Sequence, residues 1–312
     1  MTDRPIVLVL RALGLGDLVT GLPSLRLLRG QRPAHRVLLV APRRWGHLAV
    51  RAGVVDDIVD SHELAPLVAA PRHPDLAIDL HGNGMPSLAL LAELGPKRII
   101  SYAGGDAVWR HDEHEVARWC RLLGEALPAP DAHCTTVAGA LGAPPVTRMP
   151  AGRTVVHVGA AAPSRRWPPD RFAAVAAELA ALGHTVLVTA GPAEAQIAAR
   201  VGERARVPVA TAMSVDEMLG LIGRARLLVS GDTGVAHVAA AYRRPSVTLF
   251  GPVSPRRWGP PPAAWHQVLW HGDDTGDPHA ATPDPALLRI TVDEVLAAAD
   301  RALDRQEEFS SP

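Results

Sequence analysis

The stretch Ser230-Gly231-Asp232-Thr233-Gly234-Val235-Ala236-His237 joins two kinds of predicted structure. The apolar run before it predicts a buried strand, and the run after it predicts a helix. Asp232, Thr233 and Gly234 are therefore expected where the carboxyl end of a strand leads into a helix N-terminus. Backbone N–H groups lack partners there, and the helix dipole attracts negative charge. Because His237 follows Thr233 by one helical turn, the stretch predicts a site for a phosphorylated ligand in an open α/β sheet.

Strand and helix signals alternate on both sides of this stretch. Apolar runs predict strands over residues 6–10, 36–41, 75–80, 98–101, 154–158, 185–190, 226–230 and 246–250. Helical spacing and capping signals predict helices over residues 17–29, 44–52, 86–93, 114–127, 170–182, 193–205, 215–223, 238–242 and 291–305. Residues 255–285 are rich in loop signals. Repeated βα units of this kind predict parallel sheets that helices cover on both faces.

A stretch rich in Pro, Ala and Gly, 143–152, interrupts the alternation and predicts a linker between domains. We expect an α/β protein with two Rossmann-like domains, whose parallel sheets face each other across a central cleft. The expected domains are an N-terminal one over 1–148 and a C-terminal one over 149–290. Residues 291–312 are expected to form a helix and tail that could pack back on the N-terminal domain.

Composition excludes several classes of protein. The 312 residues include 47% hydrophobic ones, enough for two cores, and the formal net charge is +0. No basic stripe is present, which argues against binding to nucleic acid. Two cysteines are too few for a disulfide framework, and no run has the pattern of a signal peptide or a membrane span. We expect a cytoplasmic protein, and peripheral contact with the inner face of the membrane stays open.

The first predicted strand is followed by a glycine-rich turn, Arg11-Ala12-Leu13-Gly14-Leu15-Gly16-Asp17. Its two glycines resemble the start of a dinucleotide-binding fingerprint, but Val19 stands where the third glycine belongs. Asp17 could act only as the N-cap of the following helix. Alternatively, the helix dipole keeps its carboxylate ionised, and the carboxylate serves as a general base toward an acceptor hydroxyl.

A loop of small residues, 159–168, follows the first predicted strand of the C-terminal domain. Arg165 or Arg166 in this loop could neutralise phosphate oxygens through a bidentate contact. The same Arg-Arg-Trp sequence occurs at 43–45 and 256–258, so the alternative for residues 165–167 is a stacked surface pair. We favour phosphate contact for the first case, because only that loop follows a strand end and opens a helix.

Other polar motifs carry weaker signals. Glu194 lies just after a predicted strand, where a carboxylate can hold ribose hydroxyls or simply favour the first turn of its helix. The loop over 250–260 is expected to support the predicted phosphate site. The histidines and acids at 111–114 lack the spacing of helical zinc motifs and are interpreted as a solvated face, and 272–277 is interpreted as a loop. No metal site is predicted.

Four segments together resemble the family 9 glycosyltransferases, which include the heptosyltransferases of lipopolysaccharide core synthesis. They are Arg11 to Pro23, Gly159 to Pro168, Val229 to His237, and Leu249 to Pro260, and His81-Gly82-Asn83-Gly84 is also similar. The resemblance implies a GT-B fold that binds its donor in the C-terminal domain. It also implies inverting, metal-independent transfer of a heptose or hexose from a nucleoside-diphosphate sugar to a hydroxyl of a glycan, glycolipid or other acceptor.

The resemblance also implies the roles of individual residues. Asp17 is implied as the catalytic base, Glu194 as a ribose contact and Met213 as a contact to the nucleotide base. The implied donor-binding residues are Gly159, Ala160, Ala161, Arg165, Glu194, Met213, Asp232, Thr233, Gly234 and His237. The implied acceptor-side residues are Arg11, Gly14, Gly16, His81 and Asn83. Arg165 stands where the family usually has Lys, and Ala160 and Ala161 replace hydroxyl residues of some members.

No cofactor is expected, because the nucleoside-diphosphate sugar, with ADP-heptose as one candidate, is the substrate. Two other functions fit the same architecture. A nucleotide-sugar epimerase would convert the donor without an acceptor, and a non-catalytic binding protein would leave every activated sugar intact. The sequence does not specify the donor nucleotide, the sugar, the acceptor or the oligomeric state.

Overall fold

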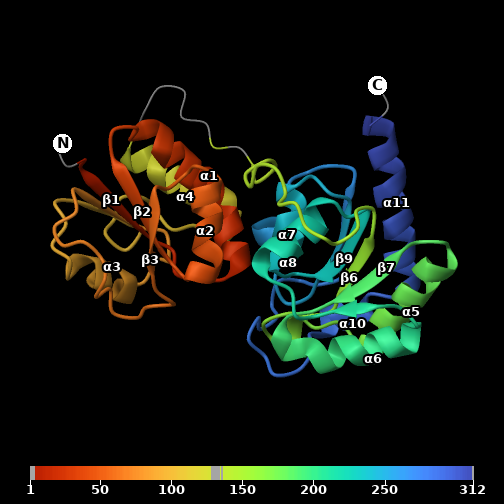
Figure 1. Cartoon of the computed structure of the whole chain (residues 1–312). Coiled ribbons are helices and arrows are strands. Elements are labelled where there is room, and N and C mark those ends of the chain that lie inside the picture. Colours follow the sequence, from red (N-terminus) through yellow and green to blue (C-terminus); the bar gives the residue numbers. More distant parts are fainter. Residues whose placement is uncertain (1–3, 128–133, 135, 311–312) are drawn as a thin grey trace. The chain divides into compact units, whose positions relative to one another are not determined.

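The computed structural model describes residues 4–127, 134 and 136–310, the last five of these by their backbone alone. The chain divides into two compact units, unit 1 from Met1 to Gly142 and unit 2 from Ala143 to Pro312 (Figure 1). Each unit is built around one sheet whose neighbouring strands are parallel throughout the described residues. The prediction of two α/β domains is confirmed.

The sheet of unit 1 has five short strands. They are β1 (Ile6–Leu10), β2 (Arg36–Ala41), β3 (Asp57–Asp60), β4 (Leu76–Asp79) and β5 (Ile99–Ile100). Their order across the sheet is β3-β2-β1-β4-β5, so that β1 is central. Val7 of β1 pairs with Val37 on one side and with Leu76 on the other. The residues from Val7 to Leu10 are fully buried, as expected of an apolar strand in a sheet covered on both faces.

The described residues of unit 1 also form four helices. They are α1 (Leu15–Gln31), α2 (Arg43–Arg51), α3 (Met85–Ala92) and α4 (Glu115–Ala126). Helix α1 packs against α4. Four leucines that recur along α1 at helical spacing are all buried, namely Leu18, Leu22, Leu25 and Leu28. This packing fixes the first turn of α1 beside the carboxyl end of β1.

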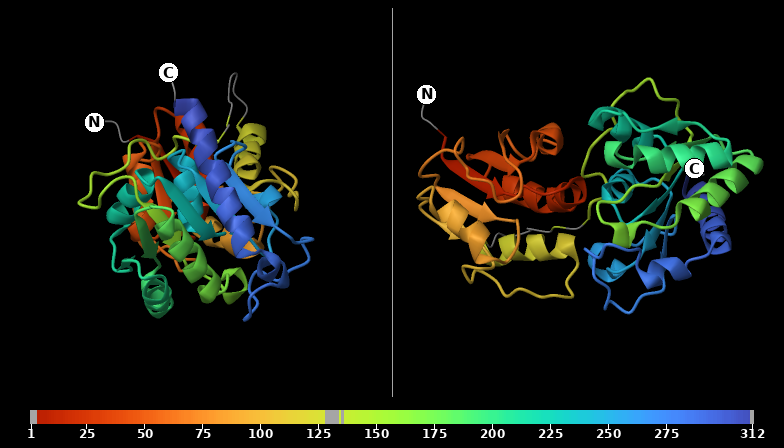
Figure 2. Two further views of the ribbon diagram at one scale, coloured as in Figure 1. Left: turned by 90° about the vertical axis from the view of Figure 1, so that its right-hand side faces the viewer. Right: turned by 90° about the horizontal axis from the view of Figure 1, so that it is seen from below.

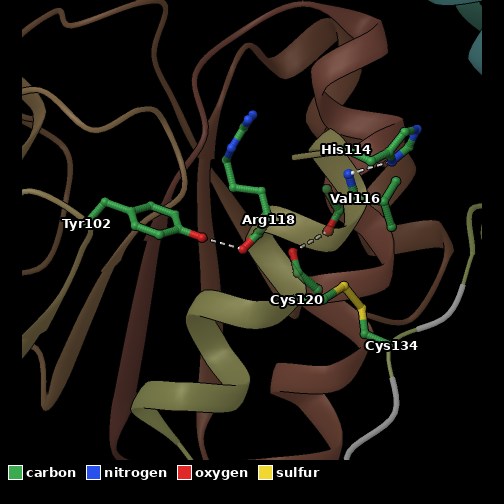
Figure 3. The surroundings of a disulfide bond; sticks show 8 residues. Tyr102, His114, Val116, Arg118, Cys120 and Cys134 are labelled. Atoms are coloured by element: carbon green, nitrogen blue, oxygen red, sulfur yellow. Dashed lines mark hydrogen bonds between the residues drawn. A yellow bond between two sulfur atoms is a disulfide. The ribbon is translucent and has the colours of Figure 1, made fainter. Parts of the chain in front are cut away.

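Cys120 of α4 forms a disulfide with Cys134 (Figure 3). Nearby, the Tyr102 hydroxyl donates a hydrogen bond to the Arg118 carbonyl at 2.5 Å, which attaches the segment after β5 to the same helix. Two cysteines cannot form a framework, and here they make a single crosslink between α4 and residue 134.

The sheet of unit 2 has six strands. They are β6 (Thr154–His157), β7 (Val186–Thr189), β8 (Val209–Ala210), β9 (Leu227–Gly231), β10 (Ser246–Phe250) and β11 (His266–Trp270). Their order is β11-β10-β9-β6-β7-β8. Val156 pairs with Val229 of β9 and with Val188 of β7, and all three side chains are completely buried.

Helices cover the sheet of unit 2. They are the short 3₁₀ helices η1 (Pro163–Arg165) and η2 (Pro192–Glu194), and the α-helices α5 (Pro169–Ala181), α6 (Ala195–Ala205), α7 (Val215–Gly223), α8 (Gly234–Ala241), α9 (Pro255–Trp258), α10 (Pro285–Arg289) and α11 (Val292–Ser310). Ser214 caps α7, because its hydroxyl accepts the Glu217 N–H while the Glu217 carboxylate accepts the Ser214 N–H. Among the described residues, no helix is both long and apolar enough to cross a membrane.

Helix α11 packs on the sheet of its own unit. It contacts β9, β10, β11 and α5, and Figure 2 shows it in dark blue alongside these elements. Its apolar residues Val295, Ala298, Ala299 and Ala302 are completely buried in the core of unit 2. Residues 292–310 are therefore an integral part of the second unit, whereas the sequence suggested a separate segment that could pack back on the N-terminal domain.

The predicted linker is attached to unit 2 over part of its length. The Arg224 guanidinium of α7 donates hydrogen bonds to the Pro145 carbonyl at 2.9 Å and to the Thr147 hydroxyl at 2.7 Å. Gly220 and Gly223 leave the surface of α7 bare where this segment lies, and a side chain at either position would collide with it. The division between the units thus falls at 142/143 instead of the predicted 148/149.

Several short elements escaped prediction. Strands β3 and β8 offer only two apolar residues each, and β11 lies in the stretch 255–285 that was interpreted as loop-rich. Helix α8 begins four residues earlier than the predicted 238, directly after Thr233. This shift places the whole predicted phosphate site at the first turn of α8.

Candidate functional site

The order of the strands creates one switch point in each sheet. In unit 1 the chain proceeds outward from β1 to β2 and β3, and then places β4 on the other side of β1. In unit 2 it proceeds from β6 to β7 and β8, and then places β9 on the other side of β6. Ligands of open α/β sheets bind beyond the carboxyl ends of the strands at such points. Most of the predicted site residues lie in the loops that follow β1, β4, β6 and β9.

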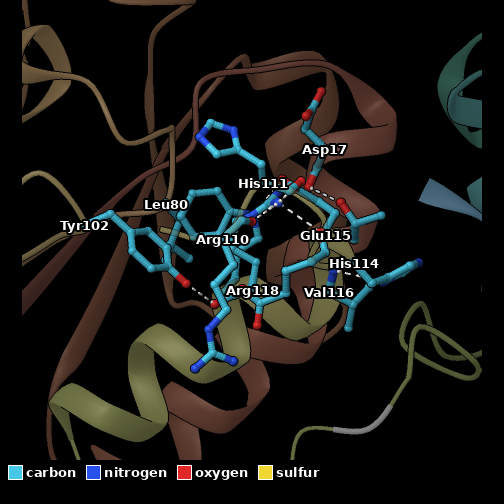
Figure 4. Close-up of polar contacts among 12 residues, drawn as sticks. Asp17, Leu80, Tyr102, Arg110, His111, His114, Glu115, Val116 and Arg118 are labelled. Atoms are coloured by element: carbon cyan, nitrogen blue, oxygen red, sulfur yellow. Dashed lines mark hydrogen bonds and ion pairs between the residues drawn. The ribbon is translucent and has the colours of Figure 1, made fainter. Parts of the chain in front are cut away.

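Arg11 connects the two loops at the switch point of unit 1. Its Nε donates a hydrogen bond to the Asp17 carbonyl and its Nη1 to the Leu80 carbonyl, both at 2.5 Å. Its Nη2 lies 3.1 Å from a carboxylate oxygen of Glu115, a residue that Figure 4 shows close to Asp17. The Arg11 side chain has no exposed surface. It lies against Gly21, and a side chain at position 21 would collide with it. Arg11 was expected on the acceptor side, but the structure makes it a buried support for the turn that carries Asp17.

Asp17 is the third residue of α1, and the N-cap of this helix is Gly14. The Asp17 carboxylate reaches back and accepts the Gly14 N–H at 3.2 Å. Its other oxygen lies 3.9 Å from Arg11 Nη2, and 30% of its side chain stays exposed. Gly16 lies in the same turn, and its carbonyl accepts the Thr20 hydroxyl at 3.0 Å. The N-cap interpretation of Asp17 is therefore wrong, and the carboxylate is held in one orientation while remaining open to solvent.

His81 follows β4 and adjoins the same cluster. Burial, and then the Arg11 guanidinium, lower the pKa of His81, although the Asp17 and Glu63 carboxylates act to raise it. The buried Nδ1 of His81 has no hydrogen-bond partner among the described residues. The exposed Asn83 lies two residues further on in the same turn. Unit 1 thus brings together Asp17 and a neutral imidazole above one buried arginine.

Asp79, the last residue of β4, fixes the turn that carries His81. Its carboxylate accepts the Ser87 hydroxyl at 2.6 Å and the His81 N–H at 2.9 Å. The side chain is fully buried, and burial raises the pKa of Asp79 despite these two hydrogen bonds. Asp79 is therefore a structural residue that holds the turn after β4.

Arg165 spans the switch point of unit 2. It ends η1 in the loop after β6, and its Nη1 lies 3.5 Å from the Asp232 carboxylate, which follows β9. The Arg165 carbonyl lies so close to Gly231 that a side chain there would press on it at 3.1 Å. The loop thus depends on a glycine at the end of β9. Gly159 and Ala160, which begin the loop, are buried, and Ala161 is exposed.

Arg166 points to the opposite side of the same loop. Its Nη2 lies 3.2 Å from the Glu194 carboxylate, which follows β7, and its Nε donates to the Ala160 carbonyl at 2.9 Å. The sequence left open which of the two arginines meets phosphate. The structure separates them, because Arg165 borders the first turn of α8 through Asp232, whereas Arg166 borders Glu194.

The first turn of α8 presents backbone N–H groups at the end of β9. Thr233 is the N-cap, and its side chain makes no capping hydrogen bond, while the Ala236 N–H donates to the Thr233 carbonyl at 3.0 Å. A helix N-terminus of this kind favours an anion. His237, one turn later, is buried and lies edge-on to the Trp258 ring at a centroid distance of 5.9 Å. Trp258 belongs to α9, so the segment after β10 contacts His237 in the first turn of α8.

Two further residues complete the carboxyl edge of this sheet. Met213 lies between β8 and the Ser214 cap of α7. His157, the last residue of β6, was missed, although a polar residue ending an apolar strand just before Gly159 is a usable signal. Its Nδ1 lies 3.0 Å from the Thr189 hydroxyl oxygen, and burial lowers its pKa to about 4, which keeps the ring neutral at physiological pH.

The two units offer complementary chemistry. Unit 1 presents an exposed carboxylate that is suited to accept a proton, and unit 2 presents an arginine and a helix N-terminus that are suited to bind an anion. Among the described residues, no three His, Cys, Asp or Glu side chains gather in a way that could hold a metal ion.

Comparison with known proteins defines the class to which this arrangement belongs. The structure of a family 9 glycosyl transferase from Veillonella parvula matches with a TM-score of 0.79 at 20% identity, over 97% of this chain and 98% of that one. The ADP-heptose lipopolysaccharide heptosyltransferase II of Escherichia coli matches with a TM-score of 0.75 at 21% identity, over 96% and 99%. The fold is the GT-B fold, with two parallel-sheet α/β domains.

Sequence comparison identifies the family. A profile described as glycosyltransferase family 9 (heptosyltransferase) matches residues 98–279, more than half of the chain. Lipopolysaccharide heptosyltransferase 3 of Escherichia coli is 30% identical over 149 residues, which are 44% of this chain and 43% of that protein. Lipopolysaccharide heptosyltransferase 2 of Escherichia coli K12 is 31% identical over 157 residues, or 46% and 44%. The matched part spans less than half the length of either relative. The chain belongs to glycosyltransferase family 9.

We predict that Glu115 stabilises unit 1 in a pH-dependent way. Burial acts to raise its pKa, but the Arg11 and Arg118 guanidinium groups and the Trp119 N–H outweigh burial and lower the pKa below its ordinary value of 4.5. A group with a lowered folded-state pKa contributes stability above its unfolded-state pKa and loses it as the pH falls through the folded-state value. Glu115→Gln should therefore reduce the free energy of unfolding at pH 7 by about 3–5 kcal/mol, because it leaves two buried arginines without their counter-charge.

Urea unfolding of the wild type and the variant at pH 7 and pH 4 measures this effect, and the difference between them should shrink at the lower pH. Glu125→Gln is the matched control on the same helix. Glu125 is exposed and pairs only with Arg121 one turn away, so its loss should cost about 0.3–0.5 kcal/mol. Equal losses for the two variants at pH 7 would contradict the prediction.

Proposed function

We propose that the protein is an inverting, metal-independent glycosyltransferase. It transfers a heptose or a hexose from a nucleoside-diphosphate sugar to a hydroxyl of a glycan, a glycolipid or another acceptor. The observation that carries the proposal is the position of Arg165 across the switch point of unit 2, beside the uncapped N-terminus of α8. A cation and a row of backbone N–H groups at this point fit a diphosphate.

We propose the donor nucleotide from the ligands of proteins with the same fold. Solved structures of the Escherichia coli heptosyltransferase WaaC contain ADP and ADP-2-deoxy-2-fluoro heptose, and they share this fold with TM-scores of 0.70 and 0.68. We therefore place ADP-heptose first among the candidate donors. In this assignment Gly159, Ala160 and Ala161 lie beside the nucleotide, Glu194 meets the ribose, and Met213 meets the base.

The proposed reaction is one displacement at the anomeric carbon of the donor. The acceptor hydroxyl oxygen attacks this carbon while the bond from the carbon to the diphosphate oxygen breaks. Asp17 takes the hydroxyl proton, and the diphosphate leaves with the electron pair of the broken bond. Arg165, the first turn of α8 from Asp232 to Gly234, and His237 stabilise the negative charge on the leaving group. The reaction requires Asp17 and the α8 N-terminus to meet the same donor and acceptor.

The acceptor site belongs to unit 1 in this proposal. Gly14 and Gly16 shape the turn, while His81 and Asn83 line the approach to Asp17. The neutral state of His81 suits a sugar hydroxyl, because an uncharged imidazole can donate or accept a hydrogen bond. A glycan or glycolipid acceptor would place the enzyme at the inner face of the cytoplasmic membrane.

We predict that Asp17→Asn retains donor binding but loses about 10²–10⁴-fold in turnover, because the amide cannot take the acceptor proton. The measurement is nucleoside diphosphate release with donor and acceptor present, together with donor affinity by calorimetry. Asp57→Asn is the control, since Asp57 is exposed, pairs with Arg36 and accepts the N–H of its neighbour Ile58, far from the turn that carries Asp17 in the sequence. Near-normal turnover of Asp17→Asn would refute the assignment, and conversion of the donor to an epimer without acceptor would favour the epimerase.

We predict that one nucleoside diphosphate among ADP, GDP, UDP and dTDP stabilises the protein strongly. A ligand at 100 times its dissociation constant adds about 2.7 kcal/mol to the free energy of unfolding, which a thermal-shift screen detects readily. Arg165→Ala should weaken that ligand about 10- to 100-fold, because a charge-assisted contact to phosphate is lost. Arg204→Ala is the control, since Arg204 forms an exposed ion pair with Asp170 elsewhere in unit 2. Unchanged affinity of Arg165→Ala, measured by calorimetry, would exclude its proposed role.

A further inference from the structure

The loop after β6 sends two consecutive arginines to opposite neighbours. Strand β6 lies between β9 and β7 in the sheet. Arg165 pairs with Asp232 after β9 at 3.5 Å, and Arg166 pairs with Glu194 after β7 at 3.2 Å. The two arginines therefore occupy different parts of the carboxyl edge, and they need not share one task.

The Arg166 guanidinium is held at both of its ends. Its Nε donates to the Ala160 carbonyl of its own loop at 2.9 Å, while its Nη2 holds the Glu194 carboxylate. The Glu194 side chain is 12% exposed and the Arg166 side chain 31%. A guanidinium is planar and rigid, so anchoring one edge of it fixes the direction of the other. Arg166 thus determines where the Glu194 carboxylate lies.

The carboxylate lies over two glycines at the ends of two neighbouring strands. A side-chain carbon at Gly191 would lie 2.9 Å from Glu194 Oε2, and one at Gly159 would lie 3.4 Å from it. Any larger residue at Gly191 would therefore displace the carboxylate. Arg166 binds Oε1, and within the described part of the chain Oε2 accepts no hydrogen bond. One oxygen is thus anchored and the other is available as an acceptor.

We propose that Arg166 is a positioning residue for ribose recognition, which it achieves by holding Glu194, and that it does not bind the diphosphate. This inference rests on the proposed function. A carboxylate beyond a strand end accepts hydrogen bonds from the ribose hydroxyls in nucleotide-binding α/β folds. In this inference Arg165 is the arginine that binds the phosphates.

The test compares three probes, ADP, 2′,3′-dideoxy-ADP and inorganic pyrophosphate, by calorimetry with the full chain. The wild type should bind ADP about 10-fold more tightly than the dideoxy analogue. Arg166→Ala should lower the affinity for ADP to that for the dideoxy analogue, and should leave the other two affinities unchanged. Arg165→Ala should instead weaken all three probes, and the control Arg204→Ala should weaken none of them.

Two further variants separate positioning from loss of folding. Glu194→Gln should reproduce the effect of Arg166→Ala, and the double variant should bind ADP no more weakly than either single one, because both act through one contact. Arg166→Lys keeps the charge without the planar geometry and should restore ADP affinity only in part. Thermal unfolding of each variant confirms that it is folded.

The outcomes distinguish the inference from the proposed function. If Arg166→Ala weakens pyrophosphate and the dideoxy analogue as much as ADP, Arg166 binds phosphate directly and the inference is wrong. If the wild type binds ADP but does not favour it over the dideoxy analogue, the inference also fails while the proposed function stands. If none of ADP, GDP, UDP and dTDP binds the wild type, the proposed function fails, and the inference fails with it.

Discussion

Each sheet of this protein extends in both directions from one central strand, and everything at the site follows from that constraint. When the chain leaves β1 toward β2 and later returns to place β4 on the other side, the loop after β1 has no crossover above it on the β4 side. The same holds for the loop after β6, which lies beside β9. Backbone N–H groups, small residues and charged side chains of two loops can therefore meet the same ligand. In unit 1 this position holds the Asp17 carboxylate, and in unit 2 it holds Arg165 and the first turn of α8.

Charge pairing makes these loops stable without a ligand. Arg11 is fully buried, and a buried guanidinium is tolerated only when other groups neutralise it and satisfy its donors. Glu115 supplies the opposite charge, and the carbonyls of Asp17 and Leu80 and the Thr20 hydroxyl accept further hydrogen bonds from the guanidinium. In unit 2 each arginine of the loop after β6 has one carboxylate within ion-pair distance, so the positive charge that an anion needs is already oriented before binding. Binding of an anion would then require little rearrangement of these arginine side chains.

Local patterns were sufficient to predict much of this arrangement, and contacts between distant residues account for what they missed. The burial of the leucines of α1 and the structure of the stretch from Ser230 to His237 follow from patterns that are only a few residues long. The role of Arg11 depends on Glu115, 104 residues away, and so no local pattern could show that Arg11 is buried. Arg166 meets Glu194 across 28 residues for the same reason. The attachment of residues 143–148 to unit 2 depends on Gly220 and Gly223 of α7. In the sequence, these two look like any glycines that lower the stability of a helix.

The carboxylate of Asp17 and the anion site at α8 are supported by separate sets of contacts. Every contact that orients Asp17 comes from unit 1, since Arg11, Gly14 and Glu115 all lie there. Every contact that orients Arg165 and Arg166 comes from unit 2. Energetic effects of substitutions add when the residues share no partners and fail to add when they do. Damage to the support of Asp17 should therefore leave the geometry of the anion site intact.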